Sequence, residues 1–239
     1  MPATCRIDTE KYKAVLFDLD GVITDTMGLH YEAYRQAFAK YGIHVTPLEI
    51  YRTEGMPSME VGKAIVKEKG ANLSGELVKK LIDDKREIYR ALAAKDAKTF
   101  PGVPETLRML RENGIKLALI TGSNAKSAAG VIREVGLEGA FDVIVTGDDT
   151  ARGKPYPDPY LKGMERLGIP PDKCVVVENA PLGIQAAKAS GAGYVIAVTT
   201  TLPEQYLKGA DDVMQSFADI EGCLARRLGK QATGHQPSI

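Results

Sequence analysis

The stretch that decides the fold reads KAVLFDLDGV and spans residues 13–22. Its four consecutive apolar residues, 14–17, predict a strand that is buried on both faces, as in a parallel sheet. Asp18 and Asp20 follow where this strand ends. Because ligands bind outside the carboxyl ends of the strands in open parallel sheets, both aspartates are candidate functional residues.

Further apolar runs of the same kind occur later in the chain, at residues 117–120, 143–145, 175–177 and 195–198. Segments with helical spacing of apolar residues lie between several of them. This alternation predicts an α/β fold with a doubly wound parallel sheet covered by helices on both faces. We expect the core domain to comprise residues 11–23 and 99–222.

The interval 24–98 breaks this alternation, because it has helical patterns and no convincing buried strand. An apolar pattern from Met27 ends at Gly42, and Thr46 with Pro47 predicts the start of a second helix. Ser58 is the candidate cap of a third helix. The expected apolar stripe of a fourth comprises Leu77, Leu81, Ile88 and Leu92. We expect 24–98 to form an all-helical cap domain, and 1–10 and 229–239 to be flexible termini.

The composition restricts the partners of the protein. Lys plus Arg and Asp plus Glu both number 31 in 239 residues, so no excess of one sign favours nucleic acid or an anionic membrane. The three cysteines lack the spacing of a zinc site or a disulfide framework, and we find no signal peptide or spanning segment. We expect a cytoplasmic protein, either a monomer or a weak homodimer.

Polar residues follow the later apolar runs, as they follow the first. They are Thr121-Gly122-Ser123-Asn124, Gly153-Lys154-Pro155 and Glu178-Asn179. Each alone has an ordinary explanation as a turn, a helix cap or a solvated loop residue. Together they would bring several carboxylates to one sheet edge, where they repel one another unless a cation is present. Oxygen ligands suit Mg²⁺, so we predict a magnesium and phosphate site.

These four segments resemble the signature motifs of the haloacid dehalogenase-like superfamily, and the resemblance extends from about residue 13 to 221. The helical insert after the first motif is similar to the C1 cap of the subgroup that contains β-phosphoglucomutase, phosphoglycolate phosphatase and small sugar-phosphate phosphatases. The stretch 18–26 is particularly similar to the opening of β-phosphoglucomutase. The resemblance implies an enzyme that acts on a small phosphorylated metabolite.

The resemblance also implies roles for individual residues. Asp18 would attack phosphorus and form an aspartyl-phosphate, and Asp20 would be the general acid and base. Thr121 and Lys154 would complete the catalytic set. The implied metal ligands are Asp18, the backbone carbonyl of Asp20, and the pair Glu178 and Asn179. The family usually has an aspartate where this chain has Asn179, so we predict activity with an unusually high magnesium requirement.

The cap and the loops provide the candidate substrate-binding residues. His30 and Lys85 lie at apolar positions of their predicted helices, and in the β-phosphoglucomutase pattern the matching residues face the active site. Ser58 appears where the mutase has an arginine that grips a second phosphate, which favours hydrolysis over isomerisation. The full set of candidates is Thr26, His30, Gly55, Ser58, Lys85, Gly122, Ser123 and Asn124.

Four other functions stay open or are disfavoured. A sugar-phosphate mutase is the alternative closest to a phosphatase. A dehalogenase would need neither Asp20 nor a metal. A receiver-like switch phosphorylated on aspartate would use similar acids, but needs no helical lid. Nucleotide-binding folds are disfavoured, because neither a Gly-x-x-x-x-Gly-Lys-Ser/Thr loop nor a Gly-x-Gly-x-x-Gly turn follows the first strand.

Overall fold

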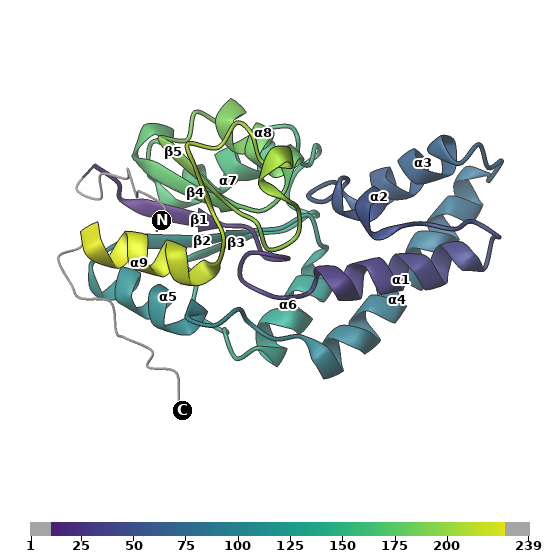
Figure 1. Cartoon of the computed structure of the whole chain (residues 1–239), viewed down its shortest axis with the longest axis horizontal. Coiled ribbons are helices and arrows are strands. Elements are labelled where there is room, and N and C mark those ends of the chain that lie inside the picture. The colour runs from purple at the N-terminus through teal and green to yellow at the C-terminus, as the bar shows by residue number, and fades with distance from the viewer. Residues whose placement is uncertain (1–10, 228–239) are drawn as a thin grey trace.

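The centre of the molecule is a six-stranded parallel sheet (Figure 1). The computed structural model describes residues 11–227, and the predicted flexible termini lie outside this part. The strand order is β3-β2-β1-β4-β5-β6, and all pairs are parallel. The strands are β1 (Ala14–Phe17), β2 (Lys116–Ile120), β3 (Val143–Val145), β4 (Cys174–Glu178), β5 (Tyr194–Val198) and β6 (Asp212–Met214). The predicted doubly wound parallel sheet is therefore confirmed.

Helices cover both faces of this sheet. Successive side chains of β1 alternate between the faces, so Val15 and Phe17 pack into one apolar core and Ala14 and Leu16 into the other. The first core includes residues of α5 (Val103–Glu112), α6 (Ala125–Glu134) and α9 (Phe217–Arg227); the second includes residues of α7 (Asp158–Leu167) and α8 (Pro181–Ala189). Two 3₁₀ turns, Pro171–Lys173 and Glu204–Tyr206, complete this lobe.

The segment between β1 and α5 forms the predicted helical cap, which projects to the right of the sheet in Figure 1. It contains α1 (Met27–Ala39), α2 (Pro47–Tyr51), α3 (Ser58–Glu68) and α4 (Gly75–Asp96) around its own apolar core. The capping box of Thr46 and Glu49 starts α2 as predicted. Two predicted details of the cap were wrong. Pro57, not Ser58, is the N-cap of α3, and Leu77, which was expected on the apolar stripe of α4, is 40% exposed.

Two chain segments connect the cap to the core, and they pair with each other. Thr24 forms an antiparallel bridge with Thr99, the backbone N–H of Asp25 donates to the carbonyl of Lys98 at 2.9 Å, and that of Phe100 donates to the carbonyl of Ile23 at 3.2 Å. The domain boundaries at 23/24 and 98/99 stay a prediction, and this paired linker lies at them. At the other end of the core, α9 continues to Arg227, beyond residue 222.

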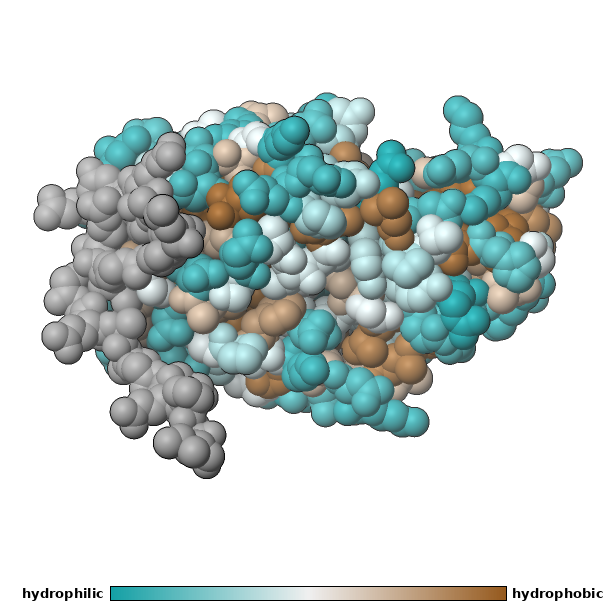
Figure 2. All heavy atoms as spheres, viewed as in Figure 1, coloured by the Kyte–Doolittle hydropathy of each residue, from teal (hydrophilic) through white to brown (hydrophobic). Residues whose placement is uncertain are grey.

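The surface shows no single dominant apolar patch on the face drawn in Figure 2, where hydrophobic residues are scattered among hydrophilic ones. Within residues 11–227, none of the helices combines the length and apolar character needed to cross a membrane. Cys174 is free and buried, whereas Cys223 is disulfide-bonded. The spacing of the cysteines did not indicate this disulfide.

Candidate active site

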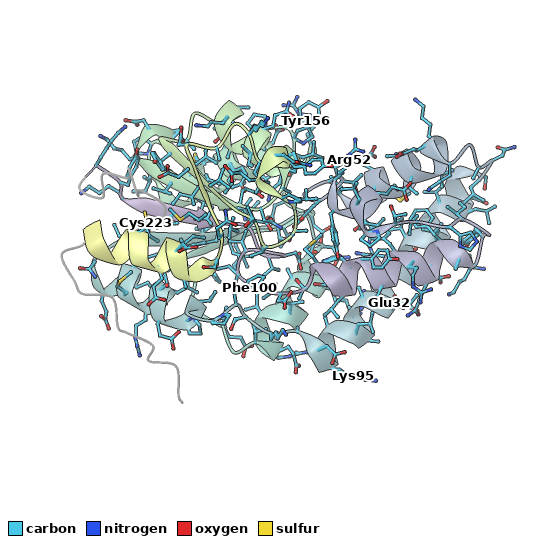
Figure 3. All side chains as sticks on the ribbon, in the orientation of Figure 1. Glu32, Arg52, Lys95, Phe100, Tyr156 and Cys223 are labelled. Carbon is cyan, nitrogen blue, oxygen red and sulfur yellow. The ribbon has the colours of Figure 1, made fainter. Side chains whose placement is uncertain are left out.

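A cleft with a cavity volume of about 50 Å³ lies between the two lobes. The core lines it with Asp18, Asp20, Thr121, Gly122 and Ser123 from the ends of β1 and β2. The cap lines it with residues of α1 to α4 and of the turn that joins α2 to α3: Met27, His30, Tyr34, Ile50, Thr53, Glu54, Gly55, Met56, Ser58, Val61 and Lys85. In Figure 3, Arg52 of the cap and Tyr156 of the core are labelled on the two sides of the junction between the lobes.

Asp18 and Lys154 form a buried ion pair at the floor of this cleft. The Nζ of Lys154 lies 2.5 Å from Oδ1 of Asp18 and 2.6 Å from Oε1 of Glu178. Tyr160 donates to the same glutamate oxygen at 2.5 Å, and the backbone N–H groups of Asn179 and Ala180 donate to the other at 3.0 and 3.4 Å. Glu178 therefore has both oxygens engaged within the protein and holds Lys154 in place, which disfavours its predicted role as a direct metal ligand.

The surroundings of Asp18 contain more negative than positive charge. Burial raises the pKa of Asp18 to about 8, although the Lys154 ammonium opposes this, and Glu178 and Asp20 add to the rise. Burial alone would lower the pKa of Lys154, but Asp18 and Glu178 hold it well above its ordinary value. The lysine is thus a permanent cation beside a carboxyl group that needs further positive charge to stay ionised at neutral pH.

Asp20 receives three contacts on one carboxylate oxygen, Oδ1. Thr26 donates to it at 2.6 Å and Tyr89 at 2.9 Å, and Nε2 of His30 lies 3.1 Å away at ion-pair distance, without hydrogen-bond alignment. Burial disfavours the charged form, but His30 and these donors together hold the pKa of Asp20 below its ordinary value. The hydroxyl of Ser123 is 3.4 Å from Oδ2, on the cleft side.

His30 and Lys85 both line the cleft from the cap. Lys85 is only 3% exposed, and its Nζ lies 2.8 Å from Nδ1 of His30 and 4.4 Å from the ring centroid of Tyr34. Burial lowers the pKa of Lys85 to about 7, and burial together with Lys85 lowers the pKa of His30. The ring of His30 also stacks on that of Tyr89 at 3.9 Å. These residues connect the cap to Asp20 without any direct contact between Lys85 and the core.

The loop after β2 supplies part of the predicted substrate site. Thr121 and Gly122 line the cleft, and the Thr121 hydroxyl accepts a bond from the Ser123 N–H at 3.0 Å. Asn124 is not among the cleft-lining residues: its side chain accepts from Ser127 N–H at 2.9 Å and caps α6. Thr26 likewise binds Asp20 and does not line the cleft. Both side chains therefore have structural partners in this structure, and their predicted contact with substrate stays a prediction.

The turn between α2 and α3, residues 52–57, rests on the core where glycines leave room. A Cβ at Gly122 would lie 2.9 Å from the carbonyl oxygen of Gly55, and one at Gly153 would lie 2.5 Å from Cδ of Pro57. Gly55 itself has φ +86°, and a Cβ there would lie 2.7 Å from Cδ of Lys154. The backbone of the cap therefore packs directly over Lys154, and the two lobes are closed against each other.

Asn179 and Glu54 connect the lobes at the end of β4. The Nδ2 of Asn179 donates to both carboxylate oxygens of Glu54, at 2.9 and 3.1 Å, and to the hydroxyl of Thr201 at 2.8 Å. Its Oδ1 is buried without a hydrogen-bond partner in the described part of the chain. Burial, followed by the charge of Asp18, raises the pKa of Glu54 well above its ordinary value. An excess of carboxylates beside an unused amide oxygen is an arrangement that fits a hard divalent cation.

The candidate metal ligands form a sparse set. Within residues 11–227, no group of three or more His, Cys, Asp or Glu side chains has the geometry to hold a metal ion. A site made of one carboxylate (Asp18), one amide oxygen (Asn179) and one backbone carbonyl (Asp20) agrees with this, because Mg²⁺ keeps several waters and needs few protein ligands. The residues present therefore fit Mg²⁺.

Three residues of this site escaped the sequence-based prediction. Tyr89 follows Lys85 by four positions in α4, so it shares a helix face with that lysine and could have been inferred. Tyr160 lies in the first turns of α7, shortly after the Gly153-Lys154-Pro155 loop. Glu54 precedes Gly55, but no local pattern indicates that a turn of the cap reaches the end of β4.

Comparison with known proteins identifies the family. The model of the haloacid dehalogenase-like hydrolase family matches residues 12–191. The chain belongs to the haloacid dehalogenase-like hydrolases. This hydrolase is 36% identical over 191 residues to a phosphorylated carbohydrates phosphatase of Thermotoga maritima, covering 80% of this chain and 87% of the relative. It is 31% identical over 182 residues to the fructose-1-phosphate phosphatase YqaB of Escherichia coli, covering 76% and 94%.

The fold comparison places this haloacid dehalogenase-like hydrolase in the predicted subgroup. It superposes on the crystal structure of β-phosphoglucomutase from Clostridium difficile with a TM-score of 0.81 and 28% identity, covering 91% of this chain and 97% of that one. The predicted resemblance and the predicted enzyme class are confirmed. The chain is a phosphatase or phosphomutase of this superfamily.

Proposed function

We propose that this chain is a Mg²⁺-dependent phosphatase that acts on a small phosphorylated metabolite, of the sugar-phosphate or phosphoglycolate type, through an aspartyl-phosphate on Asp18. The observation that carries the proposal is the position of Asp18 at the floor of a closed cleft, with Lys154 2.5 Å away and Asp20 and Thr121 lining the same space. A nucleophile, a fixed cation and a second acid are the parts that phosphoryl transfer needs.

In the first step, a carboxylate oxygen of Asp18 attacks phosphorus, and the bond between phosphorus and the ester oxygen of the substrate breaks. Asp20 gives its proton to the departing oxygen. The contacts from His30, Thr26 and Tyr89 favour the ionised form of Asp20, and the negative charge of an arriving phosphoryl group raises its pKa toward the acid form. In the second step, Asp20 takes a proton from water, which attacks the aspartyl-phosphate and releases inorganic phosphate.

Mg²⁺ would supply positive charge beside the phosphoryl oxygens and would restore the ionised form of Asp18. Its proposed ligands are the Asp18 carboxylate, the Asp20 backbone carbonyl and the amide oxygen of Asn179. Glu178 is left out of this set, since its oxygens are bound by Lys154, Tyr160 and backbone N–H groups. Lys154 and Thr121 would bind the remaining phosphoryl oxygens.

A monophosphate suits the cleft better than a bisphosphate. Among the described residues that line it there is no arginine, and Ser58 occupies the position where the mutase resemblance expects one. The named phosphatase relatives act on phosphorylated carbohydrates and on fructose 1-phosphate. A phosphomutase is the alternative, and it would convert a sugar phosphate into its isomer when a catalytic amount of sugar bisphosphate is supplied.

The proposal is tested by measuring phosphate release from a panel of sugar phosphates, phosphoglycolate and nucleotides, with MgCl₂ and after chelation with EDTA. We expect release from at least one small phosphate ester, with loss of activity in EDTA and in Asp18→Asn. Isomerised sugar without free phosphate would support the mutase instead. Full activity of Asp18→Asn would contradict both.

A further inference from the structure

The side chain of Asn179 lies between the two lobes, and hydrogen bonds to both lobes hold its amide in one orientation. All three hydrogen-bond contacts of its Nδ2 are with oxygen atoms, two of Glu54 in the cap and one of Thr201 in the core. Because the Glu54 carboxylate and the Thr201 hydroxyl contact the Nδ2 side of the amide, Oδ1 points away from both. This oxygen is buried and has no hydrogen-bond partner in the part of the chain that is described. The residue is 0% exposed, so no bulk water satisfies that oxygen.

Glu54 is the charged group at this contact. Within residues 11–227 it forms no ion pair, and its hydrogen-bond partner is the neutral amide of Asn179. The cations nearby are already engaged, because Lys154 binds Asp18 and Glu178, and Lys85 binds His30. One carboxyl group of the cap therefore lies next to the active site without a compensating cation among the described residues, and its raised pKa agrees with this.

Residues 54 and 179 are chemically complementary, because an amide donor faces a carboxylate acceptor. An aspartate at position 179 has almost the same shape, but it would set a second carboxylate against Glu54 at hydrogen-bond distance, where like charges repel. The asparagine amide instead donates to Glu54 and keeps an oxygen free. The carboxylate charge that is missing from the core at this position is thus present in the cap.

We propose that Glu54 is a positioning residue for the metal centre: it orients the Asn179 amide, supplies the negative charge that Asn179 lacks, and so couples divalent-cation binding to closure of the cap. This inference rests on the Mg²⁺ dependence proposed above. A cation at Oδ1 makes the Nδ2 hydrogens better donors and attracts the Glu54 carboxylate, which strengthens the contact between the lobes. By linkage, a closed cap must strengthen cation binding to the same extent.

Calorimetric titration of MgCl₂ into the substrate-free protein tests this idea. Glu54→Gln keeps the shape and an acceptor oxygen but removes the charge, and we expect it to weaken Mg²⁺ binding by about tenfold or more, as loss of a partner of a metal ligand does. Glu60→Gln is the matched control, because Glu60 is an exposed cap glutamate paired with Lys63 and should leave the affinity unchanged. The double variant Glu54→Gln/Asn179→Asp exchanges acid and amide across the interface, and we expect it to regain at least the wild-type affinity.

The outcomes separate this inference from the proposed function. Wild-type affinity in Glu54→Gln, with a wild-type enzyme that binds Mg²⁺ and releases phosphate, would overturn the role of Glu54 alone. A double variant as weak as Glu54→Gln would also overturn it, because moving the charge to the core would then not restore binding. A wild-type protein that binds no Mg²⁺ but still releases phosphate would remove both this inference and the proposed metal dependence.

Discussion

Nζ of Lys85 lies 2.8 Å from Nδ1 of His30, so two basic side chains of the cap share one buried contact beside Asp20. Such a contact is stable when one of the two groups is neutral, since two cations at this distance repel. The lowered pKa values of both residues, caused first by burial, agree with this. The pair can therefore hold one positive charge near Asp20.

Lys85 should make the free energy of unfolding rise with pH above neutrality. Its pKa is about 7 in the folded protein and 10.5 for an ordinary lysine, so between these values the unfolded chain binds more protons than the folded one. The free energy of unfolding contributed by this residue therefore rises with pH across that interval. We expect Lys85→Met to lose this rise, as measured by urea denaturation at pH 7 and pH 9. Lys80→Met, at an exposed position of α4, should keep it, and identical pH dependence in all three proteins would contradict the assignment.

Asp20→Asn should separate the two chemical steps. We expect turnover of a sugar phosphate to fall by about 10² to 10⁴-fold, the usual contribution of a general acid and base. With an aryl phosphate, whose leaving group needs no proton, Asp18 should still be phosphorylated and the aspartyl-phosphate should accumulate. A burst of phenolate followed by slow turnover in a stopped-flow assay would show this. Asp83→Asn, at an exposed cap position, is the control, and equal losses with both substrates would argue against the role of Asp20.

Gly122→Ala should prevent full closure of the cap. The added Cβ would lie 2.9 Å from the backbone carbonyl of Gly55, which is too close for an unmoved cap. We expect a lower kcat and a larger radius of gyration by small-angle X-ray scattering, with little loss of thermal stability. Gly130→Ala is a matched control, because a Cβ there meets no neighbour and the helical position should gain about 0.5–1 kcal/mol. If Gly122→Ala has wild-type kcat, the closed contact is not needed for turnover.

Rigidifying the linker should slow turnover more than it changes metal binding. Lys98 lies in the return segment of the paired linker, and the extended backbone of Ala97, with ψ 132°, is compatible with a following proline. We expect Lys98→Pro to lower kcat and to leave Mg²⁺ affinity within a factor of about two. Lys98→Ala removes the ion pair with Asp25 without adding stiffness, and it should keep the wild-type rate. Equal kcat values for Lys98→Pro and Lys98→Ala would contradict the prediction that bending of the linker limits turnover.

The sequence predicted most of the sheet, because buried parallel strands are continuous apolar runs. The run at residues 14–17 and the later runs correspond to β1 to β5. The strand β6, Asp212–Met214, was missed, since it is short, lies at an edge of the sheet and has no such run. In α4 the predicted stripe was shifted: Leu77 is exposed, while Val78 and Ile82 are buried, because the facing helices α1 and α3 select the face and local spacing alone does not.

The site was predictable where it depends on strand ends and unpredictable where it depends on contact between lobes. Asp18, Asp20 and Thr121 follow strands, so the parallel topology alone brings them together. The contact between Glu54 and Asn179 joins positions 125 residues apart in the chain, and it depends on how the cap packs on the core. No pattern within the cap sequence indicates which of its charged residues would reach that far.

The contact of the cap turn, residues 52–57, with Gly122 and Gly153 of the core has a consequence for how the substrate preference of this protein can change. The carbonyl of Gly55 and the ring of Pro57 form that contact, whereas Met27, Ile50 and Val61 line the cleft from the cap. These three side chains thus belong to the cap helices and lie outside the turn that docks on the core. Exchanging one of these three side chains would reshape the cavity while leaving the docking surface and the chemistry at Asp18 intact, so new substrate preferences are accessible by single substitutions.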